Sequence, residues 1–519
     1  APSLPTAAGV VLHGDLHAKN AMLTGRGSLG FVDLDQAGIG AASADLGSAL
    51  AALRYHDVVA PTSGPVGAAK RLLEGYETRR PLPPPTELAW YTAAARRAGA
   101  ASRQPGPPRG ARPPRRGADP RPRDPLGGPV VTGTVLFHVQ HFLGMGHLIR
   151  AFTLAEAMTS RFRVVIVSGG RLPQGVAVPG GVELITLPAL GMDDERQLAS
   201  GDPGRTVEQV LDERRRRLIE IHDRVRPSVV LVELFPFGRK KLAPELVPLI
   251  EHARRDPRGP LVVTSIRDLL VTGRMDQRRH DARAADLLER YFDLVLVHSD
   301  PGFAVLEDSF SAPSPLGVPV VYTGFVARPE STTASPESVE PGSVVVSAGG
   351  GWAGGALMRA AIDAHPVLWK RRRLPMTLIP GPLVDAAARQ ELDALAESRR
   401  GLTVVGSVPD LLVTLRTAAV SISQCGYNTT MDLLRARVPA VLVPFGDERE
   451  NEQPRRAARL AAHGLATVVR PGSADGPALV AAVERMAGTV PPKVAWSIDG
   501  AERATNALDH ARFLRRSAS

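Results

Sequence analysis

Short apolar runs alternate with amphipathic stretches through the last three quarters of the chain. Examples are FRVVIVSGG at 162–170, VVLVELFPF at 229–237 and PLVVTSIRD at 260–268, which are strand candidates with polar or glycine ends. Continuous β-branched runs are typical of parallel strands that are buried on both faces, and the 3.6-residue periodicity between them is typical of crossover helices. The pattern therefore predicts an α/β protein with doubly wound parallel sheets.

The same alternation occurs twice, which predicts two domains. The first set of runs falls within residues 132–326 and the second within 342–519, and the Pro-, Ser- and Thr-rich segment 327–341 between them is expected to be a hinge. The stretch TNALDHARFLRR at 505–516 has helical periodicity and is expected to form a terminal helix that packs back on the first domain.

The stretch 421–453 carries the most chemistry. An apolar strand runs into a turn at Gly426, and the turn opens a helix near Asn428, Thr429 and Thr430. The side chains of these three residues are expected to cap the helix, while its free N–H groups and positive dipole end face a diphosphate without a metal. Asp432 follows about one turn later, where a carboxylate can accept the hydroxyls of a ribose.

The next apolar run, VPAVLVPF at 438–445, leads into a loop that contains Glu450, Asn451, Glu452 and Gln453. Ligands of doubly wound folds bind at the carboxyl ends of strands, so this loop is expected to contact the hydroxyls of a sugar.

These residues resemble the donor-binding half of GT-B glycosyltransferases, in particular the MurG-like group. The matching positions, in family order, are Gly426, Thr429, Asp432, Pro439 and the pair Glu452 and Gln453. The family usually has Glu where this chain has Asp432, so the ribose contact implied there would have a shorter reach. The resemblance implies a GT-B fold of two Rossmann-like domains, with an acceptor domain at 132–326 and a donor domain at 342–519.

A glycine loop follows the predicted strand at 134–140. Gly144 and Gly146 permit close backbone approach, and His147 stands at the start of the following helix. MurG-like enzymes have a comparable loop, which implies contact with the acceptor or with the donor phosphates. His147 is the candidate base for an acceptor hydroxyl, or a group that orients it, and simple helix capping is the alternative. His138 and His141 are expected to be structural.

Other strand ends supply further candidates. Glu233 is a candidate acceptor-side residue, with a loop or capping role as the alternative, and Arg267 and Asp268 also fall at a strand end that faces the expected cleft. Gly349, Gly350 and Gly351 follow the first strand of the second domain, where in GT-B families the loop approaches the nucleotide phosphates. Trp352 is either a neighbour of the base or sugar, or a filler of the domain interface.

Composition adds little to this interpretation. The chain has 519 residues, of which 44% are hydrophobic, and no apolar run long enough to cross a membrane, so a soluble, cytoplasmic protein is expected. Its single cysteine, Cys425, is expected to pack inside the phosphate loop. The basic run at 213–217 is expected to be a solvated helix face, with peripheral contact to anionic lipid at the inner membrane face as the alternative.

The formal charge of +10 does not indicate nucleic-acid binding, because much of it is local. Residues 101–130 contain seven Arg, nine Pro and two Asp, with no aromatic residue among them. Such a composition cannot form a core and lacks a stacking platform for bases, so 101–131 is expected to be a disordered linker.

The segment before this linker carries a different chemistry. His13, Asp15, Asn20 and Asp33 occur in the order of a phosphotransferase catalytic loop followed by a metal-binding strand end. Residues 1–100 resemble part of the C-terminal lobe of aminoglycoside and choline kinase-like phosphotransferases. The resemblance implies that Asp15 is the catalytic base and that Asn20 and Asp33 hold Mg²⁺. No nucleotide-binding small lobe precedes the motif, so the lobe is expected to be inactive.

The sequence thus predicts an inverting glycosyltransferase that moves a hexose or N-acetylhexosamine from a nucleotide diphosphate sugar, most simply a UDP-sugar, to an acceptor hydroxyl. No cofactor is expected for this transfer, and the acceptor is lipid-linked or a small molecule. A nucleotide-sugar 2-epimerase, a small-molecule phosphotransferase acting through the N-terminal lobe, and a non-catalytic sugar-nucleotide sensor are the alternatives.

Overall fold

The computed structural model divides the chain into two compact units, residues 1–120 and 121–519. The residues that it describes are 10–12, 21–23, 29–31, 38–40, 73, 76, 77, 131–142, 145–170, 172, 176–193, 195, 197–330, 339–350, 354–382, 384–408, 410–446 and 450–518.

The described residues of the first unit include four short strands, which are β1 (Val10–Leu12), β2 (Ala21–Leu23), β3 (Leu29–Phe31) and β4 (Gly38–Gly40). β1 pairs with β4 and β2 pairs with β3, both antiparallel.

The second unit contains two parallel sheets. The first has seven strands in the order β13-β12-β11-β10-β5-β6-β7. Their bounds are β5 (Gly133–Val139), β6 (Phe162–Ser168), β7 (Val182–Thr186), β10 (Val229–Glu233), β11 (Leu261–Arg267), β12 (Leu294–His298) and β13 (Val320–Tyr322). All neighbouring strands run parallel, as the continuous apolar runs predicted. A small hairpin, β8 (Leu190–Met192) with β9 (Leu198–Ser200), lies outside this sheet.

The second sheet has six strands in the order β16-β15-β14-β17-β18-β19, again all parallel. Their bounds are β14 (Val344–Ser347), β15 (Met376–Ile379), β16 (Leu402–Val404), β17 (Val420–Ser423), β18 (Ala440–Leu442) and β19 (Thr467–Val468). Each sheet is therefore doubly wound, because the strand order reverses once, between β5 and β10 in the first sheet and between β14 and β17 in the second.

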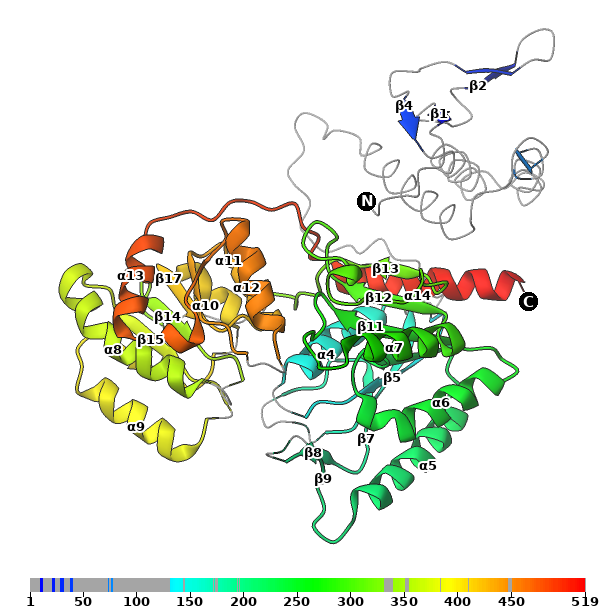
Figure 1. Ribbon diagram of the computed structural model, residues 1–519, viewed down its shortest axis with the longest axis horizontal. Helices are drawn as coiled ribbons and strands as arrows, with labels where there is room; N and C mark the ends of the chain where they lie inside the picture. The colour runs from blue at the N-terminus through cyan, green and yellow to red at the C-terminus, as the bar shows by residue number, and fades with distance from the viewer. Residues whose placement is uncertain are drawn as a thin grey trace, which may run out of the picture. The chain divides into compact units, whose positions relative to one another are not determined.

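Helices cover the faces of both sheets (Figure 1). Those that follow strands of the first sheet are α4 (Gly146–Met158), α5 (Val207–Val225), α6 (Ala243–Arg255) and α7 (Gln277–Tyr291). Those of the second are α8 (Gly355–Arg372), α9 (Ala386–Glu397), α10 (Leu411–Thr417), α11 (Tyr427–Ala436), α12 (Glu452–Ala462) and α13 (Gly476–Met486). Short 3-10 turns span Lys240–Leu242, Leu306–Asp308 and Pro471–Ser473.

The terminal helix α14 (Gly500–Ala518) returns to the first sheet, as expected from its sequence. Figure 1 shows it, in red, beside the first sheet domain rather than the second. The Thr132 hydroxyl donates a hydrogen bond to Asp509 over 3.0 Å, and Trp496, just before α14, packs edge-on against Phe303 with ring centroids 5.0 Å apart. The end of the chain therefore fastens the two sheet domains together.

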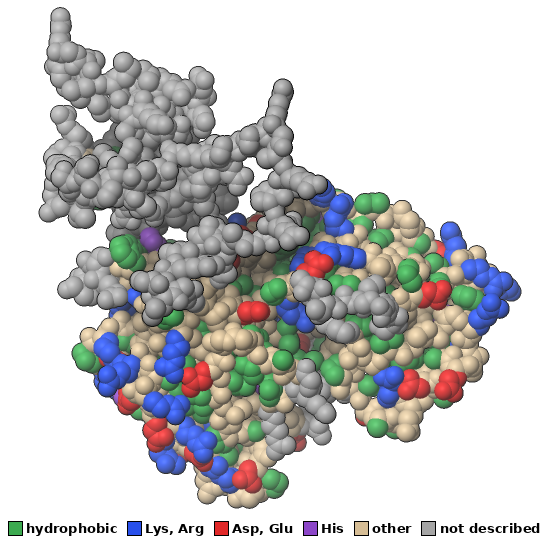
Figure 2. All heavy atoms as spheres, turned by 180° about the vertical axis from the view of Figure 1, so that it is seen from behind, with side chains coloured by type: hydrophobic (Ala, Val, Ile, Leu, Met, Phe, Trp, Pro, Cys, Tyr) green, Lys and Arg blue, Asp and Glu red, His purple; other side chains and the backbone are tan. Residues whose placement is uncertain are grey.

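The basic run in α5 corrects one prediction. Arg214 is not part of a solvated face but is fully buried, and its guanidinium makes two hydrogen bonds, of 2.6 and 2.8 Å, to the carboxylate of Glu245 in α6. Helical periodicity explains this, because Val210, Arg214 and Leu218 share the inner face of the helix while Arg215 and Arg217 point outward. On the face seen in Figure 2, Lys and Arg side chains are interspersed with acidic ones.

Candidate active site at the two switch points

The reversal point of the first sheet brings two predicted residues together. His147 lies near the start of α4, directly after β5, and Glu233 is the last residue of β10, the strand that pairs with β5. Nδ1 of His147 lies 2.5 Å from Oε1 of Glu233. Ligands of doubly wound sheets bind at such a point, because the loops after the two strands diverge and leave a crevice.

The charges around this pair determine its protonation. Burial lowers the pKa of His147 to about 3, an effect that the Glu233 carboxylate opposes and that Arg267 and Arg239 reinforce. Burial also favours neutral Glu233, but His147, Arg150 and Arg239 outweigh it and lower the pKa of that carboxyl. At neutral pH the pair is therefore neutral imidazole beside an ionised carboxylate, with the proton on Nδ1.

That tautomer leaves Nε2 of His147 with its lone pair. Nε2 makes no hydrogen bond to any described residue, and the side chain keeps 15% of its surface exposed. An imidazole held by a carboxylate at Nδ1 and free at Nε2 has the geometry to accept a proton from a substrate hydroxyl, although a pKa of about 3 makes it a weaker base than the free imidazole expected from the sequence.

Arg150 and Arg239 were not predicted, although the sequence contains a signal for the first. Arg150 lies three residues after His147 and so shares its helix face, and its Nη2 bonds Glu233 over 2.5 Å. Arg239 Nη2 lies 3.8 Å from the other Glu233 oxygen. Both guanidinium groups retain buried nitrogens without a hydrogen-bond partner in the part of the chain that the structure describes. The dyad therefore sits in a positive environment.

The reversal point of the second sheet contains the predicted phosphate loop, with one correction. α11 starts at Tyr427 and its N-cap is Gly426, so Asn428, Thr429 and Thr430 lie inside the helix and do not cap it. Thr430 instead donates its hydroxyl to the Gly426 carbonyl over 2.9 Å. Because no side chain occupies the first N–H groups of α11, they stay available for an anion.

Two helix starts meet at this place. Asn428 Nδ2, in the first turn of α11, donates to the carbonyl of Gly146, the first residue of α4, over 3.3 Å. α4, α6, α7, α8 and α12 also begin without a side-chain cap, whereas α5, α9, α10 and α13 are capped by Thr or Asp. The contact places the positive ends of α4 and α11 and the dyad around one region.

The first loop of the second sheet domain is open where it is described. Gly349 has a φ of +60°, a conformation that favours glycine, and a Cβ placed there would meet no atom within 4 Å. Gly350 follows it, and the buried hydroxyls of Ser347 and Ser423 at the paired ends of β14 and β17 have no hydrogen-bond partner among the described residues. Polar groups thus line the carboxyl edge of both central strands.

The structure places Asp432 differently from the ribose-binding position expected from the sequence. Its side chain is buried, Oδ2 lies 3.7 Å from the Arg328 guanidinium, and burial raises its pKa to about 6. The Asp432 carboxylate is thus buried and paired with an arginine rather than open to a ribose.

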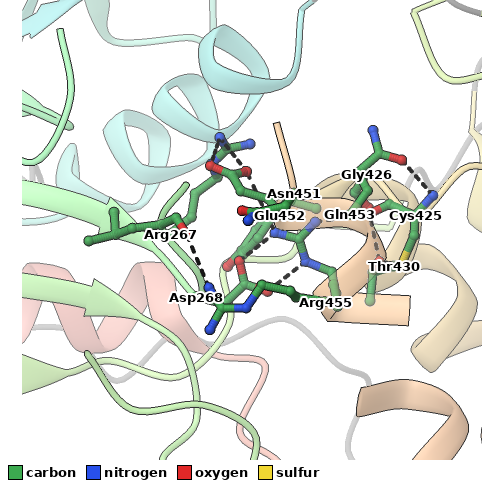
Figure 3. Close-up of polar contacts among 12 residues, drawn as sticks. Arg267, Asp268, Cys425, Gly426, Thr430, Asn451, Glu452, Gln453 and Arg455 are labelled. Atoms are coloured by element: carbon green, nitrogen blue, oxygen red, sulfur yellow. Dashed lines mark hydrogen bonds and ion pairs between the residues drawn. The ribbon is translucent and has the colours of Figure 1, made fainter. Parts of the chain in front are cut away.

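The predicted sugar-reading loop contacts the first sheet domain. Glu452 forms an ion pair of 2.7 Å with Arg267 (Figure 3). Asn451 donates a hydrogen bond to the Thr272 carbonyl over 2.8 Å. Gln453 is turned inward, where its Oε1 accepts from the backbone N–H of Cys425 at 2.9 Å and of Phe445 at 3.0 Å. Gln453 therefore shapes the phosphate loop, while Glu452 joins the two domains.

A second ion pair between the two sheet domains corrects the expectation for Asp268. Asp268 does not face an open cleft but is buried, and its carboxylate receives two hydrogen bonds of 2.6 Å from Arg456 of α12. Arg456 also donates to the Cys425 carbonyl over 2.8 Å. The turn before α11 is thus fixed from the first sheet domain, an arrangement that no local pattern in the sequence indicated.

Cys425 is buried beside this turn, as expected, and burial raises the pKa of its thiol to about 11. A separate cavity of about 270 Å³ lies between α11, α12 and residues 491–494. Its lining is mostly apolar and includes neither His147 nor Glu233, so it is not the site described above.

Several predicted residues lie outside the described part of the chain, namely Asp15, Asn20, Asp33, Gly144, Gly351 and Trp352. Their roles remain as the sequence predicted them.

Comparison with protein families agrees with both halves of this description. Residues 345–490 match the glycosyltransferase family 28 C-terminal domain, and residues 1–88 match the phosphotransferase enzyme family. The second unit, which has two doubly wound parallel sheets and matches this glycosyltransferase domain in the second of them, has a GT-B architecture. A segment that matches the phosphotransferase family precedes it in the chain. Comparison with curated proteins found no significant match.

Solved glycosyltransferase structures are similar to this chain at low identity. The glycotransferase of kitacinnamycin is 19% identical, with 74% of this chain and 95% of that chain covered and a TM-score of 0.47. MurG of Acinetobacter baumannii is 16% identical, with 74% and 99% covered and a TM-score of 0.43. The spinosyn rhamnosyltransferase is 17% identical, with 73% and 96% covered and a TM-score of 0.45. Among the described residues, no helix has the length and apolar character needed to span a bilayer.

Proposed function

We propose that this protein transfers a sugar from a nucleotide diphosphate donor, in the first place a UDP-hexose or UDP-N-acetylhexosamine, to an acceptor hydroxyl. The observation that carries the proposal is the His147 and Glu233 pair beside the uncapped start of α11, linked through the contact of Asn428 with Gly146. The match of residues 345–490 to a glycosyltransferase domain supports it.

The reaction would be a single displacement with inversion. Nε2 of His147 takes the proton of the acceptor hydroxyl as that oxygen forms a bond to the anomeric carbon. The bond from the anomeric carbon to the diphosphate oxygen breaks, and its electron pair leaves with the diphosphate. Glu233, fixed by Arg150, stabilises the imidazolium that forms.

The departing diphosphate would bind at the first turn of α11. Backbone N–H groups and the helix dipole stabilise developing negative charge in a preorganised way, so this step requires no metal ion. Gly349 and Gly350 would approach the same phosphates from the neighbouring loop. Asp432 would reach the ribose once Arg328 is displaced, and Glu452 would read the sugar once Arg267 releases it.

Two measurements test this function. The first is a thermal-shift screen of UDP, TDP and GDP and their hexoses with the full chain, because a ligand that binds the folded state raises the melting temperature. A specific rise with one nucleotide is expected, and the absence of any rise would refute the donor site.

The second measurement separates binding from chemistry. His147→Ala should keep the donor-induced shift but lower turnover of the donor, by transfer or hydrolysis, about 100- to 10,000-fold. His280→Ala is the matched control, because His280 also pairs with a carboxylate, at 3.0 Å from Asp281, but lies on α7. Equal turnover in the two variants would exclude His147 as the base.

A further inference from the structure

A cluster of two histidines and two aspartates lies at the end of the helix pair α5 and α6. His222 and Asp223 belong to the last turn of α5, His252 belongs to the last turn of α6, and Asp256 caps α6. The two helices pack side by side (Figure 1). They end before β10 and β11 begin, so the cluster lies at the opposite edge of the sheet from His147 and Glu233.

Three ligand atoms converge in this cluster. Oδ1 of Asp223 lies 2.6 Å from Nε2 of His252 and 3.2 Å from Nδ1 of His222, and one ligand atom from each of the three residues lies within 4.8 Å of the others. The two imidazole rings are nearly perpendicular, with centroids 5.0 Å apart. Two imidazole nitrogens and one carboxylate oxygen form a ligand set that suits Zn²⁺, Co²⁺ or Ni²⁺.

Hydrogen bonds to the two carboxylates cannot satisfy both ring nitrogens of a neutral His222. Its Nδ1 faces Asp223 at 3.2 Å, and its Nε2 faces a second carboxylate, Asp256, at 3.8 Å. Neutral imidazole has one N–H, so one ring nitrogen must direct a lone pair at a carboxylate. The His222 side chain is fully buried.

A cation at Nδ1 resolves this conflict. The metal would take the Nδ1 lone pair and share Asp223 Oδ1, and the ring proton would then sit on Nε2, facing Asp256. A histidine ligand commonly donates its second N–H to a carboxylate, which fixes the ring and strengthens the ligand. Asp256 is itself held in place by Arg258, whose guanidinium lies 2.5 Å from Oδ2. Nε2 of His222 has no hydrogen bond to any described residue, which is the defect that this arrangement would correct.

The electrostatic setting also favours a cation. α5 and α6 both end at the cluster, and helix C-termini carry partial negative charge. Asp223 and His252 keep 55% and 35% of their side-chain surface exposed, so an ion can enter from solvent and retain water ligands.

We propose that Nδ1 of His222, Nε2 of His252 and Oδ1 of Asp223 bind a divalent transition-metal ion that fastens α5 to α6. The site is independent of the proposed glycosyl transfer. Its role is structural, because it lies at the edge of the sheet remote from the dyad.

Cobalt and zinc titrations of the full chain, produced without a histidine tag, test the proposal. Co²⁺ should produce visible d–d absorption bands that Zn²⁺ displaces, and calorimetry with Zn²⁺ should show one micromolar or tighter site. His252→Ala and Asp223→Ala change exposed side chains and should remove this site, whereas His280→Ala should retain it. Asp256→Asn keeps all three ligands and should weaken Zn²⁺ binding about 10- to 100-fold.

The variants also distinguish this site from metal binding by other histidines of the chain. Only a metal ion bound at this site should be lost when His252 or Asp223 is replaced. The same variants should lose the rise in melting temperature that Zn²⁺ produces in the unmodified chain. Equal stoichiometry in His252→Ala and His280→Ala, or affinity weaker than millimolar in the unmodified chain, would overturn the proposal.

Discussion

The buried ion pair between Asp268 and Arg456 gives the sharpest prediction for stability. The Asp268 carboxylate and the Arg456 guanidinium are 0% and 1% exposed and share two hydrogen bonds of 2.6 Å. Asp268→Ala leaves the arginine charged and without its carboxylate inside the seam between the two sheet domains. Arg456 then keeps one described hydrogen bond, to the Cys425 carbonyl, and a longer ion pair of 4.0 Å with Glu452.

The expected loss follows from two estimates. Unit charges about 4 Å apart interact by about 4 kcal/mol at an effective dielectric constant of about 20. Removing one partner of a buried pair destabilises proteins by about 3–5 kcal/mol, because the other charge stays buried without compensation. Asp268→Ala should therefore lower the free energy of unfolding by about 3–5 kcal/mol. Replacing both residues, as in Asp268→Leu with Arg456→Met, should recover most of this loss, because no lone charge remains.

Equilibrium urea unfolding, followed by tryptophan fluorescence, measures the effect. Trp496, one of four tryptophans in the chain, lies between the two sheet domains and packs on Phe303, so its contribution to the emission changes when the domains separate. Asp286→Ala, which breaks an exposed pair with Arg290, is the control and should leave the midpoint unchanged. A loss below about 1 kcal/mol for Asp268→Ala, or a double variant no more stable than the single one, would refute the reasoning.

Three further predictions concern pH and reactivity. Because the pKa of His147 is lowered to about 3, kcat/KM should show no His147-dependent acidic limb between pH 5 and 8, and a limb near pH 6.5 would contradict the assignment. Cys425, with a pKa raised to about 11, should not react with a thiol reagent at pH 8 until urea unfolds the chain, and rapid native labelling would show that the phosphate turn is open. Burial raises the pKa of Asp432 from 3.8 to about 6, so its protonation favours the folded state, and this contribution, complete below about pH 4, is lost as pH rises through 6. Asp432→Asn should therefore increase the free energy of unfolding at pH 7.5 by up to about 3 kcal/mol, seen as a higher melting temperature, and should not do so at pH 4. A variant that melts at a higher temperature at pH 4 alone would contradict the direction of this pKa shift.

The fold and the place of the site could be predicted from the sequence because their signals are local. The strand expected at 134–140 is β5 at Gly133–Val139, and the strand expected before Gly426 is β17. Continuous apolar runs indicate parallel strands, and the glycines and polar residues after them indicate the carboxyl edge at which ligands bind. His147 and Glu233 were identified separately by their positions at strand ends.

The errors arose where a side chain has more than one partner within reach. The N-cap of α11 was predicted at Asn428, Thr429 or Thr430, because Thr and Asn usually cap helices. The helix instead has Gly426 as its N-cap, two to four residues earlier. Arg214 was assigned to solvent because its neighbours are charged, yet the helix turns it toward Glu245. Asp268 was assigned to the cleft, and the seam with α12 buries it instead.

The sequence by itself determined the two doubly wound sheets, the loops at their carboxyl edges and the residue types available there, since periodicity and turn preferences act over a few neighbouring residues. Only the tertiary structure decided that His147 pairs with Glu233, that Arg456 pairs with Asp268, and that His222 stands between two carboxylates. These pairings join separate elements of the chain. Their geometry depends on how crossover helices pack and on which charges become buried, and neither property is encoded in any single stretch of residues.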